Sequence, residues 1–271
     1  MPELAEVEYY RKRWDPALHQ TIDRVVAREG SHVLRDVDSS ALVKTLTGTT
    51  FQSSEAAAKQ MAFRFSGNVW LGIHLGMTGE LKRLDRDYPP AKHDHLVFFT
   101  AKHALVFSDP RMFGRVQFSV GPSAPGWWTS IAPALLSSAF TVEAVGDFLA
   151  RRKKSPIKAV LLMQERFPGI GNWMADEILW RAEIHPKRLA GSLNAAEIKE
   201  LHQQCRWVAR EALKIIGEDF GDLPKSWLFH HRWEDGGVCP KTGVPLKREE
   251  IGGRTTCWSP GRQNLTGWRA A

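Results

Sequence analysis

The chain has 271 residues, of which 43% are hydrophobic and 25% charged, and its formal net charge is +7. These values are ordinary for a soluble globular protein of one large domain or two smaller ones. No apolar run reaches the roughly 18 residues that a membrane span needs, and no signal peptide is evident, so we expect a cytoplasmic location. The three cysteines are too few and too scattered for a disulfide framework.

The basic excess favours a polyanionic partner, and nucleic acid is the first candidate. Part of it lies in the run Arg151-Arg-Lys-Lys154. A run of like charge is also typical of a plain solvated face.

The first eight residues, Met1-Pro-Glu-Leu-Ala-Glu-Val-Glu8, carry the strongest chemical signal. If Met1 is removed, Pro2 becomes a secondary amine with a pKa of roughly 8. Such an amine can attack electrophilic carbon and form an iminium, with Glu3 beside it to move protons. The alternative is structural, because proline is common at the first position of a helix. Residues 3–14 are expected to form that helix, with one apolar face.

The next hundred residues predict mainly strands. A first strand is expected at 21–29, and residues 40–52 are ambiguous. Runs of aromatic and β-branched residues separated by turn residues predict strands at 61–65, 69–75, 95–100, 104–107 and 116–118. Their spacing indicates a β-sandwich or barrel, with the N-terminal helix packed beside it.

The composition then changes to a helical pattern. Residues 121–140 resemble a linker, and helices are expected from Ser155-Pro156 to about Arg166, from Asn172 to about Ala182, and from a capping box at Asn194 to Gly217. Cys205 is expected in the core of the last helix. A strand at 227–233 and a hairpin of residues 244–246 and 255–257, turning at Gly252-Gly253, follow.

We therefore predict an α+β fold of three parts. They are a β-sandwich domain (1–125), a helical domain (126–217) and a C-terminal hairpin (218–271).

Three further segments could carry chemistry. The glycine-rich turn Phe167-Pro-Gly-Ile-Gly-Asn172 precedes a helix, where free N–H groups bind phosphate. Met77 in His74-Leu-Gly-Met-Thr-Gly79 and Phe113 in Ser108-Asp-Pro-Arg-Met-Phe-Gly114 are apolar residues in loops. They are either core residues or wedges that fill the hole left by a flipped nucleotide.

These segments together resemble the formamidopyrimidine-DNA glycosylase/endonuclease VIII family. That family opens with the same octet, except that Ala5 stands here in place of a second proline. The resemblance implies a helix–two-turn–helix domain and catalysis by Pro2 and Glu3, supported by Glu6 and Lys59. It further implies phosphate contacts from Lys59, His74, His93, Lys158, Asn172 and Arg254. By the same resemblance Met77, Arg111 and Phe113 fill the vacated space, and Arg111 pairs with the orphaned base.

The chain departs from the family pattern at two places. Ala56-Ala-Ala58 replaces basic residues before Lys59. The family's zinc finger has four cysteines, whereas here the segments are Cys239-Pro-Lys-Thr242 and Cys257-Trp-Ser-Pro260. Since a structural zinc needs four ligands, we expect a zincless finger with no cofactor. Trp258 and Trp268 are the candidates for packing in its place. For His93-Asp-His95 a packed loop or a phosphate contact is favoured over a metal pair.

The resemblance implies a monomeric enzyme of base excision repair acting on damaged double-stranded DNA. It would remove oxidised or ring-opened bases through an iminium and then cut the strand as an abasic-site lyase. The alternative is a protein that binds lesions or abasic sites without cutting. The short segment 217–226 predicts a weak preference for 8-oxoguanine, because preferring members close a long loop over that base.

Overall fold

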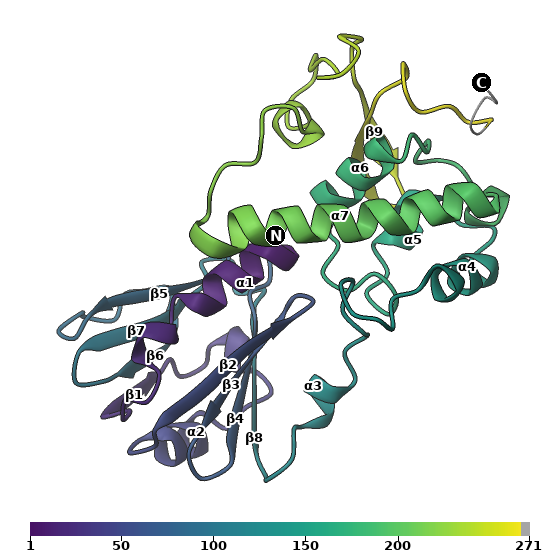
Figure 1. The fold of residues 1–271 in the computed structure, drawn as a ribbon. Coiled ribbons are helices and arrows are strands. Elements are labelled where there is room, and N and C mark those ends of the chain that lie inside the picture. Colours follow the sequence, from purple (N-terminus) through teal and green to yellow (C-terminus); the bar gives the residue numbers. More distant parts are fainter. Residues whose placement is uncertain (267–271) are drawn as a thin grey trace. The chain divides into compact units, whose positions relative to one another are not determined.

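The computed structural model describes residues 1–266, so Trp268 and Arg269 lie outside the described residues. The chain divides into two compact units (Figure 1). The first is Met1–Ile131 and the second begins at Ala132. No helix within residues 1–266 is long and apolar enough to cross a membrane.

The first unit is the expected β-sandwich with helices. Its helical elements are α1 (Leu4–Lys12), η1 (Asp15–Ala17), η2 (His32–Leu34), α2 (Ser39–Leu46) and α3 (Gly126–Thr129). Its strands are β1 (Arg24–Ala27), β2 (Phe51–Ala57), β3 (Gln60–Phe65), β4 (Val69–His74), β5 (Glu80–Asp85), β6 (Asp94–Phe99), β7 (His103–Ser108) and β8 (Arg115–Val120).

Two antiparallel four-stranded sheets face each other across one apolar core. Their strand orders are β1-β6-β7-β5 and β2-β3-β4-β8. Trp14 lies in the core, with its ring centroid 4.8 Å from Phe63 of one sheet and 5.5 Å from Phe98 of the other. Helix α1 packs on β2, β3 and β5, so it contacts both sheets. The chain start is therefore fixed beside the sandwich, as the apolar face of residues 3–14 predicts.

Two elements of the first unit escaped the sequence patterns. The ambiguous residues 40–52 hold most of α2 and the start of β2. Strand β5 was missed because it is an edge strand and carries Glu80, Lys82, Arg83 and Asp85. Charged side chains on edge strands are a normal protection against aggregation, and they hide the apolar alternation.

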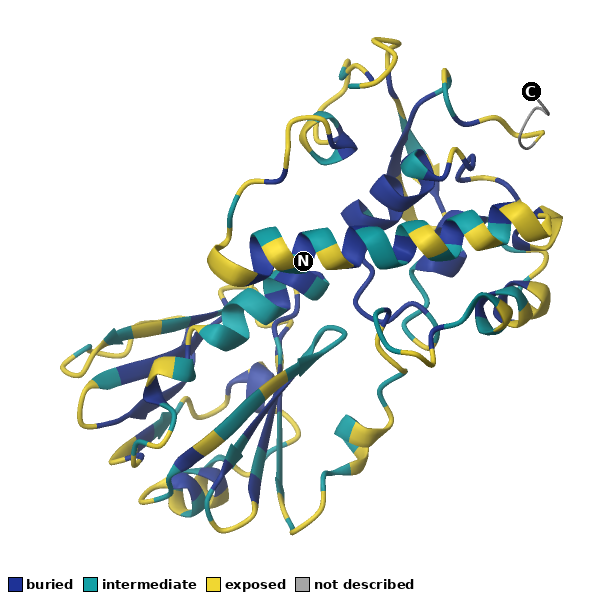
Figure 2. Ribbon diagram, viewed as in Figure 1, coloured by how far each residue is buried: buried dark blue, intermediate teal, exposed yellow. Residues whose placement is uncertain are grey.

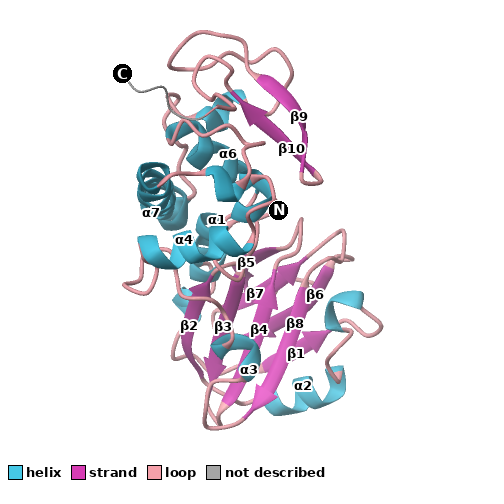
Figure 3. Cartoon of the chain, turned by 90° about the vertical axis from the view of Figure 1, so that its right-hand side faces the viewer, coloured by secondary structure: helices cyan, strands magenta, loops and turns pink. Residues whose placement is uncertain are grey.

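The second unit is helical and ends in a hairpin (Figure 3). Its elements are α4 (Val142–Arg151), α5 (Ile157–Leu161), α6 (Asn172–Arg181), η3 (Ala190–Ser192), α7 (Ala195–Asp219), η4 (Leu228–His231), β9 (Lys247–Ile251) and β10 (Arg254–Trp258). Helix α6 is the centre of this unit, because it packs on α5, α7, η4 and β10. Every residue from Trp173 to Trp180 is buried (Figure 2).

Several predicted boundaries in this unit were wrong. The helix expected to reach Arg166 ends at Leu161, because the Gln164 side chain bonds the carbonyls of Leu162 and Ile170 and forms a turn instead. Helix α6 is capped by Gly171, and Asn172 is its first residue. Helix α7 starts at the expected Asn194 capping box but runs past Gly217 to Asp219.

The predicted strand at 227–233 is also wrong, since the segment forms the 3-10 helix η4. Its aromatic residues pack separately, Trp227 on Trp207 and Phe229 on Trp173. The hairpin is confirmed, with its first strand at 247–251 rather than 244–246. Cys205 is fully buried in α7, as expected.

Candidate active site and nucleic-acid interface

Pro2 precedes helix α1 and is not part of it. The helix begins at Leu4, with Glu3 as its N-cap, so Pro2 is not at the first helical position. Glu3 and Glu6 form a capping box, in which the Glu6 carboxylate accepts the Glu3 N–H at 3.2 Å. The Glu3 side chain is 3% exposed. Pro2 therefore stands one residue before a buried N-cap glutamate, and it is not at the first helical position where the structural alternative places it.

Lys59 lies in the turn just before β3, and His74 is the last residue of the neighbouring strand β4. Lys59 follows Ala58, whose φ of 56° makes the tight turn between β2 and β3. Gln60 pairs with His74 across β3 and β4. Burial lowers the pKa of His74, and the positive charges of Lys59, Arg115 and Arg35 lower it further. His74 is therefore neutral at pH 7, in a cationic environment suited to an anion.

Met77, Arg111 and Phe113 lie in two loops of the first unit. Met77 follows β4 and is 43% exposed, and Phe113 precedes β8 and is 53% exposed. The Arg111 guanidinium lies 4.9 Å from the Phe113 ring centroid. The core alternative for Met77 and Phe113 is therefore wrong. An exposed apolar pair with a stacked guanidinium is the arrangement that can occupy a gap in a base stack.

One buried carboxylate, that of Asp109, joins these two loops. Its oxygens accept the Thr78 hydroxyl at 2.6 Å, the Gly114 N–H at 2.7 Å and the Arg111 N–H at 3.3 Å. Asp109 is 0% exposed. The sequence alone assigns no role to Asp109. Its signal was an aspartate-proline pair, which favours turn formation.

The loops also approach each other closely at Gly76. A Cβ placed on Gly76 would lie 2.4 Å from the Phe113 carbonyl carbon, and the Gly76 φ is +64°. Both the space and the backbone angle require glycine there. The loop carrying Met77 is consequently pressed against the loop carrying Phe113.

The segment His93-Asp-His95 lies at the start of strand β6, which begins at Asp94, so it is not the expected loop. His95 is 1% exposed, and its ring nitrogens contact the Ser31 hydroxyl at 2.7 Å and the Asp109 carbonyl at 2.9 Å. His93 is exposed. Within residues 1–266, no cluster of three or more His, Cys, Asp or Glu side chains is arranged to hold a metal. His95 thus supports the loop of Asp109, and His93 remains available as a surface contact.

The glycine-rich turn of the second unit leads into α6. Gly169 has a φ of +87°, and its N–H donates to the Gln164 side chain at 3.0 Å. A single glutamine in the sequence does not indicate that its side chain will organise a turn, so the role of Gln164 is visible only in the structure. The turn ends at Gly171, so α6 begins at Asn172. Asn172 donates one amide hydrogen to the Thr255 carbonyl at 2.8 Å.

Lys158 is a buried cation, which argues against the phosphate contact expected of it. It is 0% exposed, it pairs with the Asp176 carboxylate, and it donates to the Asn172 carbonyl at 2.8 Å. To reach a phosphate the ammonium would have to leave both partners. Its ammonium group instead contacts the carbonyl of Asn172, the first residue of α6.

Arg254 stands at the hairpin turn, as its motif predicts. It is the first residue of β10, is exposed, and follows Gly252 and Gly253, which have φ of +62° and +75°. A Cβ on Gly252 would lie 2.7 Å from the Ala159 Cβ, so the turn rests on α5. Arg254 and Asn172 therefore belong to one surface of the second unit.

The residues at the expected finger positions do not fit a structural zinc. Cys239 and Cys257 lie in an apolar cluster with Trp180, Leu228 and Leu246. Burial tends to raise the pKa of Cys239, but hydrogen bonding to its sulfur, which the Trp180 N–H donates at 3.3 Å, lowers it to about 7. Thr242, at one absent ligand position, has only a hydroxyl, which accepts the Val244 N–H. Pro260, at the other, has no side-chain donor atom.

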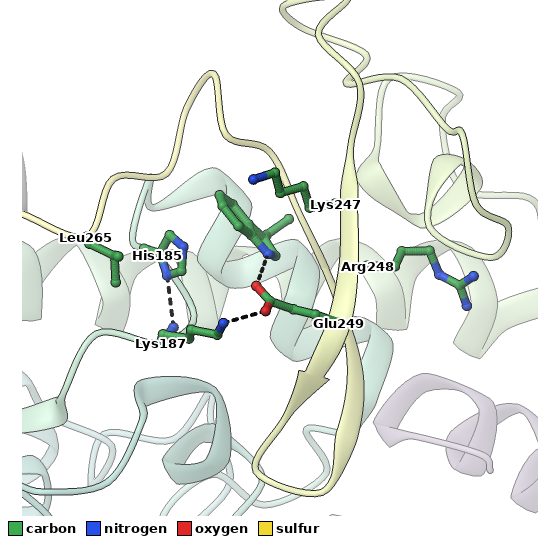
Figure 4. A pocket seen from close by; sticks show the side chains of 7 residues that line it. His185, Lys187, Lys247, Arg248, Glu249 and Leu265 are labelled. Carbon is green, nitrogen blue, oxygen red and sulfur yellow. Dashed lines mark hydrogen bonds and ion pairs between the residues drawn. The ribbon is translucent and has the colours of Figure 1, made fainter.

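Trp258 packs the hairpin onto the loop of residues 185–187, whereas the apolar cluster around Cys239 and Cys257 contains Trp180 instead of Trp258. Its ring lies 4.1 Å from the His185 ring, and its N–H donates to Glu249 at 2.8 Å. Glu249 also pairs with Lys187 (Figure 4). These residues border a hollow of about 430 Å³ that Lys247, Arg248 and Leu265 complete. The contacts join both hairpin strands to residues 185–187.

Comparisons with known proteins agree with this arrangement. Residues 1–116 match the formamidopyrimidine-DNA glycosylase N-terminal domain, and residues 131–221 match the formamidopyrimidine-DNA glycosylase H2TH domain. A formamidopyrimidine-DNA glycosylase of Laribacter hongkongensis is 34% identical, over 97% of this chain and 100% of the relative. One of Arabidopsis thaliana is 30% identical, over 98% and 72%.

Solved structures of this kind of glycosylase also resemble the chain over nearly its whole length. Lactococcus lactis Fpg (MutM) in complex with DNA containing an oxidised pyrimidine aligns with a TM-score of 0.88 at 28% identity, over 97% of this chain and 99% of that one. MutM in complex with DNA containing carbocyclic 8-oxo-G aligns with a TM-score of 0.86 at 28% identity, over 97% and 99%.

Proposed function

Because the chain belongs to the formamidopyrimidine-DNA glycosylase family, and is thus a DNA glycosylase of base excision repair, we propose that it works through covalent catalysis at Pro2. The enzyme removes oxidised or ring-opened bases from double-stranded DNA and then cuts the strand at the abasic site. The observation that carries this proposal is Pro2 placed directly before the buried N-cap Glu3, outside helix α1.

The reaction starts once Met1 has been removed. The Pro2 nitrogen then attacks C1′ of the damaged nucleoside, the C1′–base bond breaks, and the base leaves with a proton. The nitrogen loses its own proton, the C1′–O4′ bond breaks as O4′ takes up a proton, and the opened sugar is left as an iminium. This cation acidifies the C2′ hydrogen, and its loss expels the 3′ phosphate. Glu3 is the proton carrier nearest to Pro2 in sequence, and Glu6 fixes the main chain between them.

The remaining parts of the surface bind the substrate. Met77, Arg111 and Phe113 fill the space left by the extruded nucleotide. Lys59, His74 and His93 of the first unit and Asn172 and Arg254 of the second contact phosphates. Phosphate contacts fix position without reading sequence, which suits an enzyme that must find damage in any sequence. A monomeric state and a cytoplasmic location stay predictions.

Borohydride trapping on DNA with one abasic site tests the covalent step. Protein lacking Met1 should be trapped, and Pro2→Gly or Glu3→Gln should lose strand cleavage while retaining DNA binding. The matched control is Glu8→Gln, a carboxylate of the same helix that pairs with Arg11 at 2.7 Å, and it should cleave normally. Efficient trapping of a protein that keeps Met1 would exclude Pro2 as the nucleophile. Binding without any trapping would support the alternative of a lesion-binding protein.

We also propose that the finger needs no metal. The support is the donor set, with Thr242 and Pro260 at two ligand positions and the Cys239 sulfur hydrogen-bonded by Trp180 at 3.3 Å. Cleavage should survive EDTA, and elemental analysis should find no stoichiometric zinc. One zinc per chain would refute the proposal.

A further inference from the structure

Helix α6 lies along the edge of strand β10 that does not pair with β9. Residues four apart on the helix lie opposite residues two apart on the strand. Asn172 donates to the Thr255 carbonyl at 2.8 Å, and Asp176 accepts the Cys257 N–H at 3.0 Å. Four helical residues rise about 6 Å, and two strand residues rise about 6.6 Å. Thr255 and Cys257 occupy alternate positions, so these main-chain groups point away from β9. Two side chains of α6 thus satisfy the polar groups that β10 leaves unpaired.

The Asp176 carboxylate also forms ion pairs with two buried cations. Lys158 of α5 pairs with one oxygen of its carboxylate. Arg232, which follows η4, donates to the other oxygen through Nε at 3.1 Å and Nη2 at 2.6 Å. Asp176 and Lys158 are 0% exposed and Arg232 is 5% exposed. One carboxylate therefore connects α5, α6, β10 and the segment after η4.

We propose that Asp176 is a positioning residue for DNA binding, which sets the register of β10 against α6. This inference rests on the proposed function. Arg254 is three residues before Cys257 on the same strand, and Asn172 is one helical turn before Asp176. Fixing Cys257 to Asp176 therefore fixes the distance between Arg254 and the start of α6. Both groups then meet the DNA backbone together.

The charge of Asp176 is as important as its shape. Asn in its place keeps an oxygen for the Cys257 N–H but removes the negative charge that pairs with the buried Lys158 and Arg232. Uncompensated buried charge is strongly destabilising, so the two cations are expected to move toward solvent and carry α5 and the segment after η4 with them. The register of β10 would then loosen while the rest of the unit stays folded.

A double-mutant cycle separates positioning from general stability. Affinity for a duplex with a tetrahydrofuran abasic analogue is measured for Arg254→Ala in the unaltered protein and in Asp176→Asn. Arg254→Ala should weaken binding about tenfold in the first case and less than about twofold in the second, because contacts in one network are coupled. The matched control background is Glu197→Gln, a buried carboxylate paired with Arg188 in the same unit, where the tenfold factor should persist. Equal factors in the Asp176→Asn and unaltered backgrounds would overturn the proposal.

Two further measurements keep the test decisive. If Asp176→Asn does not fold, the cycle is run in Asp176→Asn/Lys158→Met, which buries one cation fewer. Hydrogen exchange on the unaltered protein needs no variant. Since β9 does not bond the Cys257 N–H, its slow exchange would come from Asp176, and exchange as fast as in exposed peptide would overturn the inference. An unaltered protein that fails to bind the duplex would instead count against the proposed function, while the exchange result would still report on Asp176.

Discussion

At the scale of single residues, the loops of the first unit depend on two small groups. Asp109 holds both loops through three hydrogen bonds, and Gly76 permits their close approach. Neither residue is expected to touch DNA. Their effect is to keep Met77 and Phe113 exposed, against the tendency of large apolar side chains to become buried.

Asp109→Ala should lower the free energy of unfolding by about 3 kcal/mol, because it leaves three donors without their acceptor. Thr78→Val removes only one of the three bonds and should cost about 1 kcal/mol. Urea denaturation of both variants measures the difference. Equal losses would mean that Asp109 acts only through Thr78.

At the scale of elements, η4 is anchored by a buried carboxylate of α6. Glu177 accepts the Phe229 N–H at 3.1 Å and pairs with Arg181 at 2.7 Å. Burial raises the pKa of Glu177 from 4.5 to about 7, although Arg181 and the bond from Phe229 oppose it. Between pH 4.5 and 7, Glu177 is therefore protonated in the folded protein and ionised in the unfolded chain.

This difference makes the protein less stable as the pH rises. Between pH 4.5 and 7 the folded state binds the extra proton, so the free energy of unfolding falls through this window, by on the order of 3 kcal/mol from this group. Below pH 4.5 the contribution is fully present. Urea denaturation at several pH values, compared with Glu177→Gln, isolates it. A constant difference between the two proteins across pH 4.5–7 would contradict the prediction.

The segment after α7 is the element that bears on which bases are removed. The helix runs to Asp219 and η4 begins at Leu228, so even fewer residues connect them than the sequence suggested. So short a connection has little chain left to form a lid over an extruded base. We expect weak preference for 8-oxoguanine relative to ring-opened purines, oxidised pyrimidines or abasic sites, because an open site discriminates poorly. Single-turnover excision of each lesion in one sequence context is the measurement. Fastest removal of 8-oxoguanine opposite cytosine would show that another segment supplies the lid.

At the scale of the whole molecule, the net charge of +7 sets the general attraction to DNA. This attraction is independent of sequence and should weaken as salt displaces the protein from phosphates. Specific phosphate contacts add to it, and they can be counted from the salt dependence.

Arg254→Ala should reduce the slope of log affinity against log salt by about 0.9, the value for one phosphate contact. Damaged and undamaged DNA should be affected similarly, because phosphates carry no lesion information. Arg210→Ala is the matched control, an exposed arginine of α7 in the same unit, and should leave the slope unchanged. An equal change in both variants would assign the effect to net charge alone.

The sequence by itself determined the fold class and most of the candidate site. Alternating aromatic and β-branched runs identified five strands of the sandwich, and the Asn194 capping box located the start of α7. Pro2, Met77, Phe113, Asn172 and Arg254 became candidates because each stands in a short motif that resembles the family's, and their roles stay predictions. Local patterns of this kind need only the order of residues.

Only the tertiary structure decided which polar residues meet. Lys158 has the sequence appearance of a surface cation, yet it is buried because Asp176, eighteen residues later, supplies its counterion. Asp109 and Asp176 looked like ordinary polar residues because Thr78, Lys158, Arg232 and Cys257, which contact them, are distant in the sequence. A side chain's burial and partners depend on how elements pack, and local order does not carry that information. The register of β10 on α6 was therefore visible only in the folded chain.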